Sequence, residues 1–339
     1  MVEGINADGV TRWLQSYVPA LESPVKFTLI TGGHSNLTYR CEDAAGNAYV
    51  LRRPPLGHVL ESAHDMGREH KIIAALAKTA VPVAPTYGLC GDAAVNGAPF
   101  YVMKFVDGLV LNDSIATKGI AVSDRHALGM HVIDVLATLH KLDPDAVGLG
   151  DLGRKEAYLA RQLSRWTKQW EASKTHEIPA MEETRRLLDE RMPAQIGSGI
   201  VHGDYRLGNM IVKGPRILAV LDWELCTLGD PLADVGYLMN AWASPEEVES
   251  AQGDGAPTAA GGFPTRAELR ERYETATGRD LSGINYYRAF SHWRLAAIGQ
   301  GVYKRYLVGA MGANRDMNLD GYKLSVQRRA EAALALISE

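Results

Sequence analysis

The stretch from Ile200 to Gly236 constrains this chain more than any other part of its 339 residues. It contains two short apolar runs, Met210 to Val212 and Ile217 to Leu221, separated by the turn-forming sequence Lys-Gly-Pro-Arg. Apolar runs that flank such a turn predict a β-hairpin. Asn209 comes just before the first run and Asp222 just after the second. The pattern therefore predicts two oxygen-bearing side chains facing each other at the open end of the hairpin.

An amide oxygen opposite a carboxylate is a suitable site for a hard cation. Mg²⁺ usually keeps several waters and takes only one or two protein carboxylates together with substrate phosphates. Asn209 and Asp222 are therefore the candidate metal ligands. Asp204 lies on the loop five residues before Asn209. Because Asp204 is not assigned to the metal, it can act as a base.

This arrangement resembles the catalytic core of kinases, in which a loop Asp accepts the proton of the substrate hydroxyl and a downstream Asn and Asp hold metal. From His202 to Asn209 the loop reads His-Gly-Asp-Tyr-Arg-Leu-Gly-Asn, with His-Gly-Asp in place of His-Arg-Asp. Together with Leu-Asp-Trp-Glu at Leu221 to Glu224, it is similar to the aminoglycoside phosphotransferase and choline kinase group of small-molecule kinases. The longer sequence LDWELCTLGDPLADVGYL most resembles the phosphotransferase domains fused to, or encoded beside, acyl-CoA dehydrogenases.

The resemblance covers nearly the whole chain. A His-Gly-Asp sequence alone, or an Asp at the end of a strand alone, is more often a cap or a loop residue than a functional one. It is the combination of both with an Asn at the right place that favours function.

The first third of the chain has the pattern of a nucleotide-binding lobe. Residues 26–53 alternate like an antiparallel meander of three strands, and the first turn reads Gly-Gly-His-Ser-Asn. A glycine-rich turn lets backbone N–H groups approach phosphate oxygens, and Ser and Asn add side-chain donors. The candidate phosphate-binding residues are Gly32, Gly33, Ser35 and Asn36. The turn is neither a Walker A loop nor a dinucleotide GxGxxG, so a simple connection between strands is the alternative.

A helix expected over residues 61–79 carries one carboxylate in an apolar stripe. The stripe consists of Met66, Glu69, Ile73 and Leu76. A buried carboxylate is costly unless it meets a cation, and Arg52 on the third strand is the candidate partner, with Arg53 as the alternative if the register shifts by one. The pair resembles the strand-Lys to helix-Glu ion pair of kinases, with Arg in place of Lys. Arg also suits phosphate, although its geometry differs from that of Lys.

The strand that begins at Phe100 ends in a turn near Asp107. In the resembling families this point is the hinge between two lobes, where backbone groups bind adenine, and this implies that role for Lys104 to Val106. The resemblance implies a nucleotide-binding lobe over residues 1–106 and a catalytic and substrate-binding lobe over residues 107–339.

Beyond Ser123 the periodicity is mostly helical. The sequence Gly-Asp-Pro at residues 229–231 opens a helix, with Asp230 as the expected N-cap. The resemblance implies that Asp230 and Asp234 brace the catalytic loop and that His202 orients it. Candidate substrate contacts are Arg206, Glu224 and Arg294.

Two further segments concern the acceptor. Residues 244–265 are rich in Gly, Ala, Pro and acids, so they form either a loop that covers the substrate or an insertion without a role. Residues 154–174 contain six basic residues against two acidic ones. This excess is either a solvated helix face or a sign that the site favours an acidic substrate over a polycationic aminoglycoside.

Composition excludes several classes of function. The net charge of −4 argues against a general electrostatic grip on nucleic acid. Three widely spaced cysteines fit reduced thiols better than a disulfide framework. No apolar run is long enough to span a bilayer, and the start of the chain lacks the pattern of a signal peptide. We therefore expect a cytoplasmic protein without a membrane or nucleic-acid partner.

We expect an α+β, bilobal protein kinase-like fold. The amino-terminal lobe is predicted as a five-stranded antiparallel sheet with one helix, and the carboxy-terminal lobe as mainly helical with the catalytic β-hairpin. The expected function is ATP- and Mg²⁺-dependent phosphorylation of a small-molecule hydroxyl group, with Asp204 as the base. The resemblance implies a hydroxy acid or hydroxyacyl-CoA as acceptor and a functional link to an acyl-CoA dehydrogenase.

Three alternatives stay open at this point. The acceptor could be an aminoglycoside. The chain could bind nucleotide without turnover, as a pseudokinase, because Arg replaces the usual Lys. It could also be a metal hydrolase that uses Asp204, Asp222 and His202. The sequence leaves the identity of the acceptor, the choice between ATP and GTP, and the oligomeric state undetermined.

Overall fold

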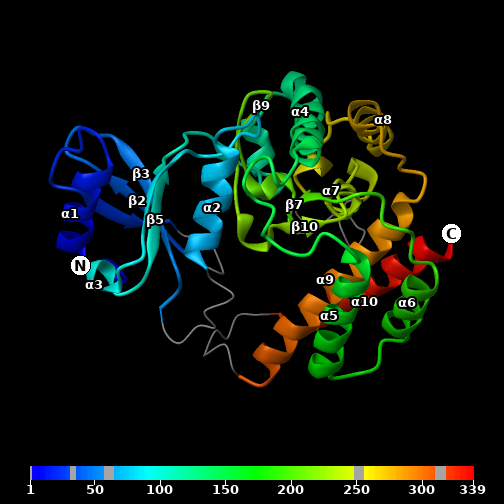
Figure 1. Ribbon diagram of the computed structural model, residues 1–339. Coiled ribbons are helices and arrows are strands. Elements are labelled where there is room, and N and C mark those ends of the chain that lie inside the picture. Colours follow the sequence, from blue (N-terminus) through cyan, green and yellow to red (C-terminus); the bar gives the residue numbers. More distant parts are fainter. Residues whose placement is uncertain (1, 31–35, 57–64, 248–255, 310–317) are drawn as a thin grey trace. The chain divides into compact units, whose positions relative to one another are not determined.

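The computed structural model describes residues 2–30, 36–56, 65–247, 256–309 and 318–339 (Figure 1). The chain divides into two compact units: Met1–Gly108 with Ile217–Leu225, and Leu109–Arg216 with Cys226–Glu339. The segment Ile217–Leu225, which the expected division assigned to the carboxy-terminal lobe, thus lies in the first unit. Two contacts hold it there, because the Val220 N–H donates to the carbonyl of Pro82 at 2.8 Å and Asp222 pairs with Arg52.

The first unit contains the predicted five-stranded antiparallel sheet, in the order β1-β2-β3-β5-β4. Its strands are β1 (Lys26–Leu29), β2 (Leu37–Glu42), β3 (Ala48–Arg53), β4 (Thr86–Cys90) and β5 (Phe100–Lys104). Along β3, side chains alternate between the two faces. Leu51 points into the main core of this unit, whereas Arg52 points to the other face. The alternation predicted from sequence is therefore confirmed for this strand.

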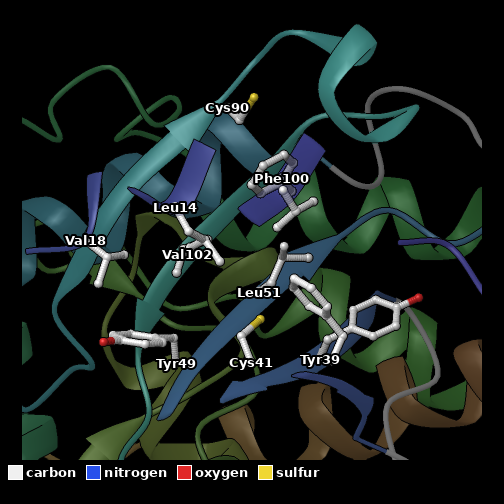
Figure 2. Close-up of a cluster of buried hydrophobic side chains, with 11 residues drawn as sticks. Leu14, Val18, Tyr39, Cys41, Tyr49, Leu51, Cys90, Phe100 and Val102 are labelled. Atoms are coloured by element: carbon white, nitrogen blue, oxygen red, sulfur yellow. The ribbon is translucent and has the colours of Figure 1, made fainter. Parts of the chain in front are cut away.

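Helices cover both faces of the sheet. They are α1 (Ala7–Tyr17), α2 (Met66–Leu76) and the single turn α3 (Ala93–Asn96). Helix α1 was not expected from the sequence, and its Leu14 packs with Leu51, Phe100 and Val102 (Figure 2). Helix α2 is the predicted one, and all four residues of its stripe are buried, Glu69 included.

The second unit is mainly helical, which confirms the α+β fold class. Its helices are α4 (Val122–Lys141), α5 (Tyr158–Ser173), α6 (Pro179–Glu190), α7 (Leu232–Asn240), α8 (Arg266–Thr277), α9 (Ile284–Leu307) and α10 (Leu319–Ser338). Its short 3-10 turns are Ala116–Gly119, Leu207–Asn209, Pro245–Glu247 and Pro257–Ala260, whereas the 3-10 turn Trp223–Leu225 belongs to the first unit. Helix α10 runs beside α9 (Figure 1). No helix in the described part of the chain is long and apolar enough to cross a membrane.

Two small ladders support the loop that carries Asp204. Strand β7 (Gly199–Val201) pairs antiparallel with β10 (Thr227–Gly229), and β6 (Leu109–Val110) pairs antiparallel with β8 (Met210–Lys213). Both strands of the predicted hairpin form, since β8 is followed by β9 (Arg216–Val220). Gly214, between them, has a positive φ of 54°.

Helix α7 packs unusually close to α9, and a glycine makes this approach feasible. A Cβ atom at Gly236 would lie 2.7 Å from the carbonyl carbon of Tyr287 and 2.9 Å from the amide nitrogen of Arg288. Both atoms belong to the backbone, so they cannot rotate away. Helix α7 also carries Asp234 and Tyr237, whose positions therefore depend on this packing.

We expect Gly236→Ala to lower the free energy of unfolding by about 1–3 kcal/mol through overpacking, although alanine has the higher helix propensity. Thermal unfolding measures the effect. Gly301→Ala is the matched control, because it also lies in a helix of the second unit and its nearest neighbour is the end of the Gln169 side chain at 3.2 Å. Equal unfolding temperatures for the two variants would contradict the packing argument.

Candidate functional site

The loop after β7 is held through its backbone. The carboxylate of Asp234 accepts hydrogen bonds from the N–H of His202 at 2.6 Å and from the N–H of Gly203 at 2.8 Å. Gly203 has a φ of +87°, a conformation that glycine adopts without steric cost. This explains the glycine of the His-Gly-Asp sequence, because the backbone must turn here to bring two successive amides to one carboxylate.

Asp234 is buried yet ionised. Burial alone would raise its pKa, but the hydrogen bonds from His140 and from the Gly203 amide hold the pKa below its ordinary value. The Nε2 atom of His140 lies 3.3 Å from the Asp234 carboxylate, and its Nδ1 atom lies 2.8 Å from the hydroxyl of Tyr273. Burial lowers the pKa of His140, so a neutral ring that donates to Asp234 and accepts from Tyr273 fits this network.

Asp204 is held by three side chains and remains partly exposed. The Nδ2 atom of Asn209 donates to the Asp204 carboxylate at 2.7 Å and to its carbonyl oxygen at 2.9 Å. The hydroxyl of Tyr237 donates to the other carboxylate oxygen, and Nε of Arg206 lies 3.3 Å from that same oxygen. The side chain of Asp204 is 21% exposed. A fixed, accessible carboxylate of this kind can accept a proton from a bound hydroxyl group.

His202 and Asp230, the two residues expected to support the loop, both form hydrogen bonds. His202 is fully buried, and its Nδ1 accepts from the Asp204 N–H at 3.2 Å. Asp230 accepts from the Leu232 N–H at 3.0 Å and from the hydroxyl of Tyr287 at 2.7 Å. The helix itself begins at Leu232, with Pro231 in the cap position that the sequence assigned to Asp230. The carboxylate of Asp230 still satisfies an amide of the first turn.

A cavity of about 360 Å³, here called the Asp204 cavity, opens beside this carboxylate. Its polar and aromatic lining consists of Asn112, Asp204, Arg206, Tyr237, Asn240, Trp242 and Arg329. The volume lies within the range of small-molecule sites. Of the lining residues, the sequence predicted only Asp204 and Arg206. The sequence could have indicated Tyr237 as a residue of this site, because it lies one helical turn after Asp234 on the same face of the helix.

The first unit holds a second cluster, centred on Arg52. One guanidinium nitrogen lies 3.2 Å from the Glu69 carboxylate and the other donates to Asp222 at 2.9 Å. The predicted ion pair between Arg52 and Glu69 is therefore present. Burial raises the pKa of Glu69 to about 7, against the opposing effect of Arg52. Burial would lower the pKa of Arg52, but the charges of Glu69 and Asp222 and the proximity of Tyr101 raise it.

Asp222 has a special backbone conformation. Its φ is +63°, in the left-handed region that few residues other than glycine adopt. Trp223, the next residue, is fully buried and donates its indole N–H to the carbonyl of Val220 at 3.0 Å. The buried indole anchors the turn, and the strained conformation aims the Asp222 carboxylate at Arg52. Strain of this kind is common where a side chain has a functional role.

Arg53 is excluded as the alternative partner of Glu69. Its guanidinium lies on the other face of the sheet, where it donates to the carbonyl oxygen of Asn96 at 3.2 Å and to that of Gly4. These bonds leave Arg52 as the residue that meets the helix carboxylate, as expected from the register of β3.

The structure describes only some of the other residues predicted for the nucleotide site. Gly32, Gly33 and Ser35 lie outside the described residues, whereas Asn36 is described and buried. The N–H of Lys104 donates to Pro85 at 2.8 Å and that of Phe105 to Ala48 at 3.4 Å. Adenine contacts at the proposed hinge would therefore use carbonyl oxygens or the amide of Val106. These binding roles stay predictions.

The candidate substrate residues occupy different positions. Arg206 lines the Asp204 cavity. Arg294 is only 8% exposed, donates to the Gly203 carbonyl at 2.8 Å and lies 5.4 Å from the centre of the Tyr237 ring. Arg294 thus supports the backbone of the loop at Gly203. Glu224 is half-buried in the 3-10 turn of the first unit, where its charge contributes to the raised pKa of Glu69. Direct substrate contact stays a prediction for all three.

The two predicted metal ligands belong to different units, and each carries an oxygen of a kind that binds hard cations. Asn209 has an amide oxygen, since its nitrogen donates to Asp204, and Asp222 has a carboxylate. Oxygen ligands of this kind suit Mg²⁺ when phosphate oxygens and water complete the shell. Among the residues that the structure describes, no three or more His, Cys, Asp or Glu side chains form a metal cluster.

Comparison with solved structures supports the fold. A Ralstonia eutropha JMP134 protein, described provisionally as an aminoglycoside phosphotransferase, is 35% identical, with a TM-score of 0.82 and coverage of 98% of each chain. The aminoglycoside phosphotransferase APH(4)-Ia, in complex with ADP and hygromycin B, is 15% identical, with a TM-score of 0.61 and coverage of 96% of this chain and 97% of its own. The second likeness concerns the fold alone.

Comparison with protein sequences identifies the family. Acyl-CoA dehydrogenase family member 10 of Mus musculus is 40% identical over 311 residues, which cover 90% of this chain and 29% of that protein. The chain thus spans less than half the length of the curated relatives it matches. A family model described as "Phosphotransferase enzyme family" matches residues 26–284. The chain belongs to the phosphotransferase enzyme family.

Proposed function

We propose that this protein is an ATP- and Mg²⁺-dependent kinase that phosphorylates a hydroxyl group of a small molecule. The observation that carries the proposal is the Asp204 carboxylate, fixed by Asn209 and Tyr237 and open to a cavity of about 360 Å³. The reaction class follows from the family, whose members transfer phosphoryl groups.

In this proposal Asp204 orients the acceptor hydroxyl and takes its proton. The hydroxyl oxygen forms a bond to the terminal phosphorus of ATP while the bond from that phosphorus to ADP breaks, and the proton moves to the carboxylate. Asn209 and Asp222 would hold Mg²⁺, which neutralises charge on the phosphate oxygens when bound. Most of the rate enhancement then comes from positioning and charge stabilisation.

The nucleotide is assigned to residues 1–106. Arg52, held by Glu69, would contact its phosphates, and a guanidinium suits that task because it donates in a planar fork. Backbone groups near Lys104 and Val106 would contact adenine. Gly32, Gly33, Ser35 and Asn36 would add donors to the phosphates. Residues 107–339 would supply the base and the acceptor site.

The proposed acceptor is a hydroxy acid, free or as its coenzyme A thioester. The similarity to acyl-CoA dehydrogenase family member 10 supports this substrate class and a functional link to an acyl-CoA dehydrogenase. The charged side chains of the Asp204 cavity also disfavour a polycationic aminoglycoside, because the lining contains two arginines and one aspartate.

The decisive experiment is a mass-spectrometric screen for phosphorylated products with ATP, Mg²⁺ and panels of hydroxy acids, hydroxyacyl-CoA thioesters and aminoglycosides. Asp204→Ala should reduce transfer by about 10²–10⁴-fold, because the general base is lost, and should still bind nucleotide. Asp189→Ala, at an exposed aspartate of α6, is the control.

Equal product from Asp204→Ala and the parent would remove Asp204 from the mechanism. ATP-independent hydrolysis would favour the metal hydrolase alternative. Nucleotide binding without phosphoryl transfer would favour the pseudokinase alternative.

Loss of the Arg52–Glu69 ion pair should weaken ATP binding. We expect Arg52→Gln and Glu69→Gln each to raise the KM for ATP by about tenfold or more, the equivalent of one charge-assisted hydrogen bond. Arg52→Lys should retain part of the affinity, since it keeps the charge but not the fork. Arg12→Gln, on the exposed face of α1, serves as the control. An unchanged KM in both glutamine variants would contradict the assigned role of Arg52.

Glu69 should also make stability depend on pH. Its pKa rises from 4.5 to about 7 on folding, so the folded chain binds this proton more tightly than the unfolded chain does. The stabilisation is complete below the lower value and is lost as the pH rises through the higher one. Denaturant unfolding over this range should show a decline in the wild type that Glu69→Gln lacks and that the exposed-site variant Glu171→Gln retains. A pH-independent difference between wild type and Glu69→Gln would refute this assignment.

A further inference from the structure

One charged residue of the Asp204 cavity has no role in the transfer as proposed. Arg329 comes from α10, far along the chain from the catalytic loop, and lines the cavity together with Asp204 and Arg206. Its neighbours on the helix, Val326 and Ala330, are buried. Arg329 therefore lies at the edge of the packed face of α10, where a long side chain can reach the cavity while its helix stays docked.

The other arginines in this region have acceptors. Arg206 is paired with Asp204 at 3.3 Å. Arg266 donates to Glu247 at 2.8 Å, and Nε of Arg288 donates to the side-chain oxygen of Asn240 at 3.1 Å. Arg329 differs from them, because no hydrogen bond or ion pair joins its guanidinium to any of the residues that the structure describes.

Arg329 is partly desolvated, and its positive charge acts on a buried histidine nearby. Burial and the charges of Arg329, Arg288 and Arg266 lower the pKa of the buried His292 to about 3, so this ring is neutral at ordinary pH. Burial also lowers the pKa of Arg329 itself, and the electrostatic neighbours that oppose this effect are tyrosines. A partly desolvated cation that faces a cavity without a carboxylate partner is costly for the free protein, and an anionic ligand would remove that cost.

We propose that Arg329 binds an anionic group of the acceptor and thereby selects acidic acceptors over neutral and cationic ones. The inference rests on the proposed function, since it concerns the acceptor of the same transfer. A guanidinium can bind a carboxylate or a phosphate through two parallel hydrogen bonds, which fixes orientation as well as charge. The anion thus positions the molecule in the cavity, and its hydroxyl group faces Asp204.

Two kinds of acceptor carry a suitable anion: a free hydroxy acid through its carboxylate, and a coenzyme A thioester through its phosphates. Two substrate pairs separate them. The first pair is a short straight-chain hydroxy acid and its neutral primary amide. The second is a hydroxyacyl-CoA and the same acyl group as its N-acetylcysteamine thioester, which lacks phosphates. The kcat and KM of each acceptor, and the KM for ATP, are measured for the wild type, Arg329→Gln and Arg328→Gln.

Arg328→Gln is the matched control. Arg328 is the adjacent residue of α10 and is exposed, so the variant makes the same change in net charge away from the cavity. In the wild type, the anionic member of one pair should have the higher kcat/KM by about tenfold to hundredfold, mainly through KM. Arg329→Gln should abolish that preference and leave the KM for ATP unchanged, whereas Arg328→Gln should keep it. The pair that responds identifies the carboxylate or the phosphate.

The inference is overturned if the wild type has no preference in either pair, or if Arg329→Gln keeps the wild-type preference. If Arg329→Gln unfolds at a lower temperature than Arg328→Gln, then Arg329→Lys, which keeps the charge, should restore the preference in part, and its failure to do so counts against the inference.

Calorimetric binding of both acceptor pairs, without ATP, separates this inference from the proposed function. Anion-selective binding that Arg329→Gln abolishes, in a protein that transfers no phosphate, would uphold Arg329 and refute the kinase. Phosphoryl transfer with an anion preference that Arg329→Gln leaves unchanged would uphold the kinase and refute the role of Arg329.

Discussion

A single buried carboxylate fixes the loop on which the candidate site is built. Asp234 accepts hydrogen bonds from two successive backbone amides, at His202 and Gly203, and is held in turn by His140. Buried amides must be satisfied, so the loop cannot change its conformation without losing both bonds. Helix α7, which carries Asp234, also supplies Tyr237 to the Asp204 carboxylate and Trp242, just beyond its end, to the cavity wall. The position of α7 therefore determines where Asp204, the supporting Tyr237 and part of the acceptor site lie.

Some parts of the molecule could be predicted because local chemistry leaves few solutions. A carboxylate in an apolar helix stripe requires a cation, and strand alternation offered Arg52 or its neighbour Arg53. The structure places Arg52 on Glu69 and uses Arg53 on the other face. Alternation and turns predicted the first three strands of the antiparallel sheet, whereas the number of five strands was an expectation from the resemblance to kinases. The loop motif predicted Asp204 as the base and Asn209 as a metal ligand; these roles stay predictions, and a hydrogen bond joins the two side chains.

Other parts depend on tertiary packing that no local pattern encodes. Helix α1 and the approach of Arg329 to the Asp204 cavity are settled by long-range contacts. The sequence offered Arg294 as a possible substrate contact, yet this side chain is buried behind the loop and supports the backbone of Gly203. A polar residue in an apolar helix signals that it has a partner, but it does not say whether that partner is a ligand or the protein's own backbone.

The bridging position of Arg52 has a consequence for the order of binding. Its guanidinium holds Glu69 and Asp222 at once, so an oxygen of the proposed metal ligand is engaged by a competing cation. A divalent ion that arrived by itself would have to displace this arginine and leave a partly buried guanidinium with one anion fewer. A triphosphate changes the balance, because its oxygens can serve both cations. Under the proposed function, ion and nucleotide would therefore enter as a preformed chelate, and the free ion would bind weakly.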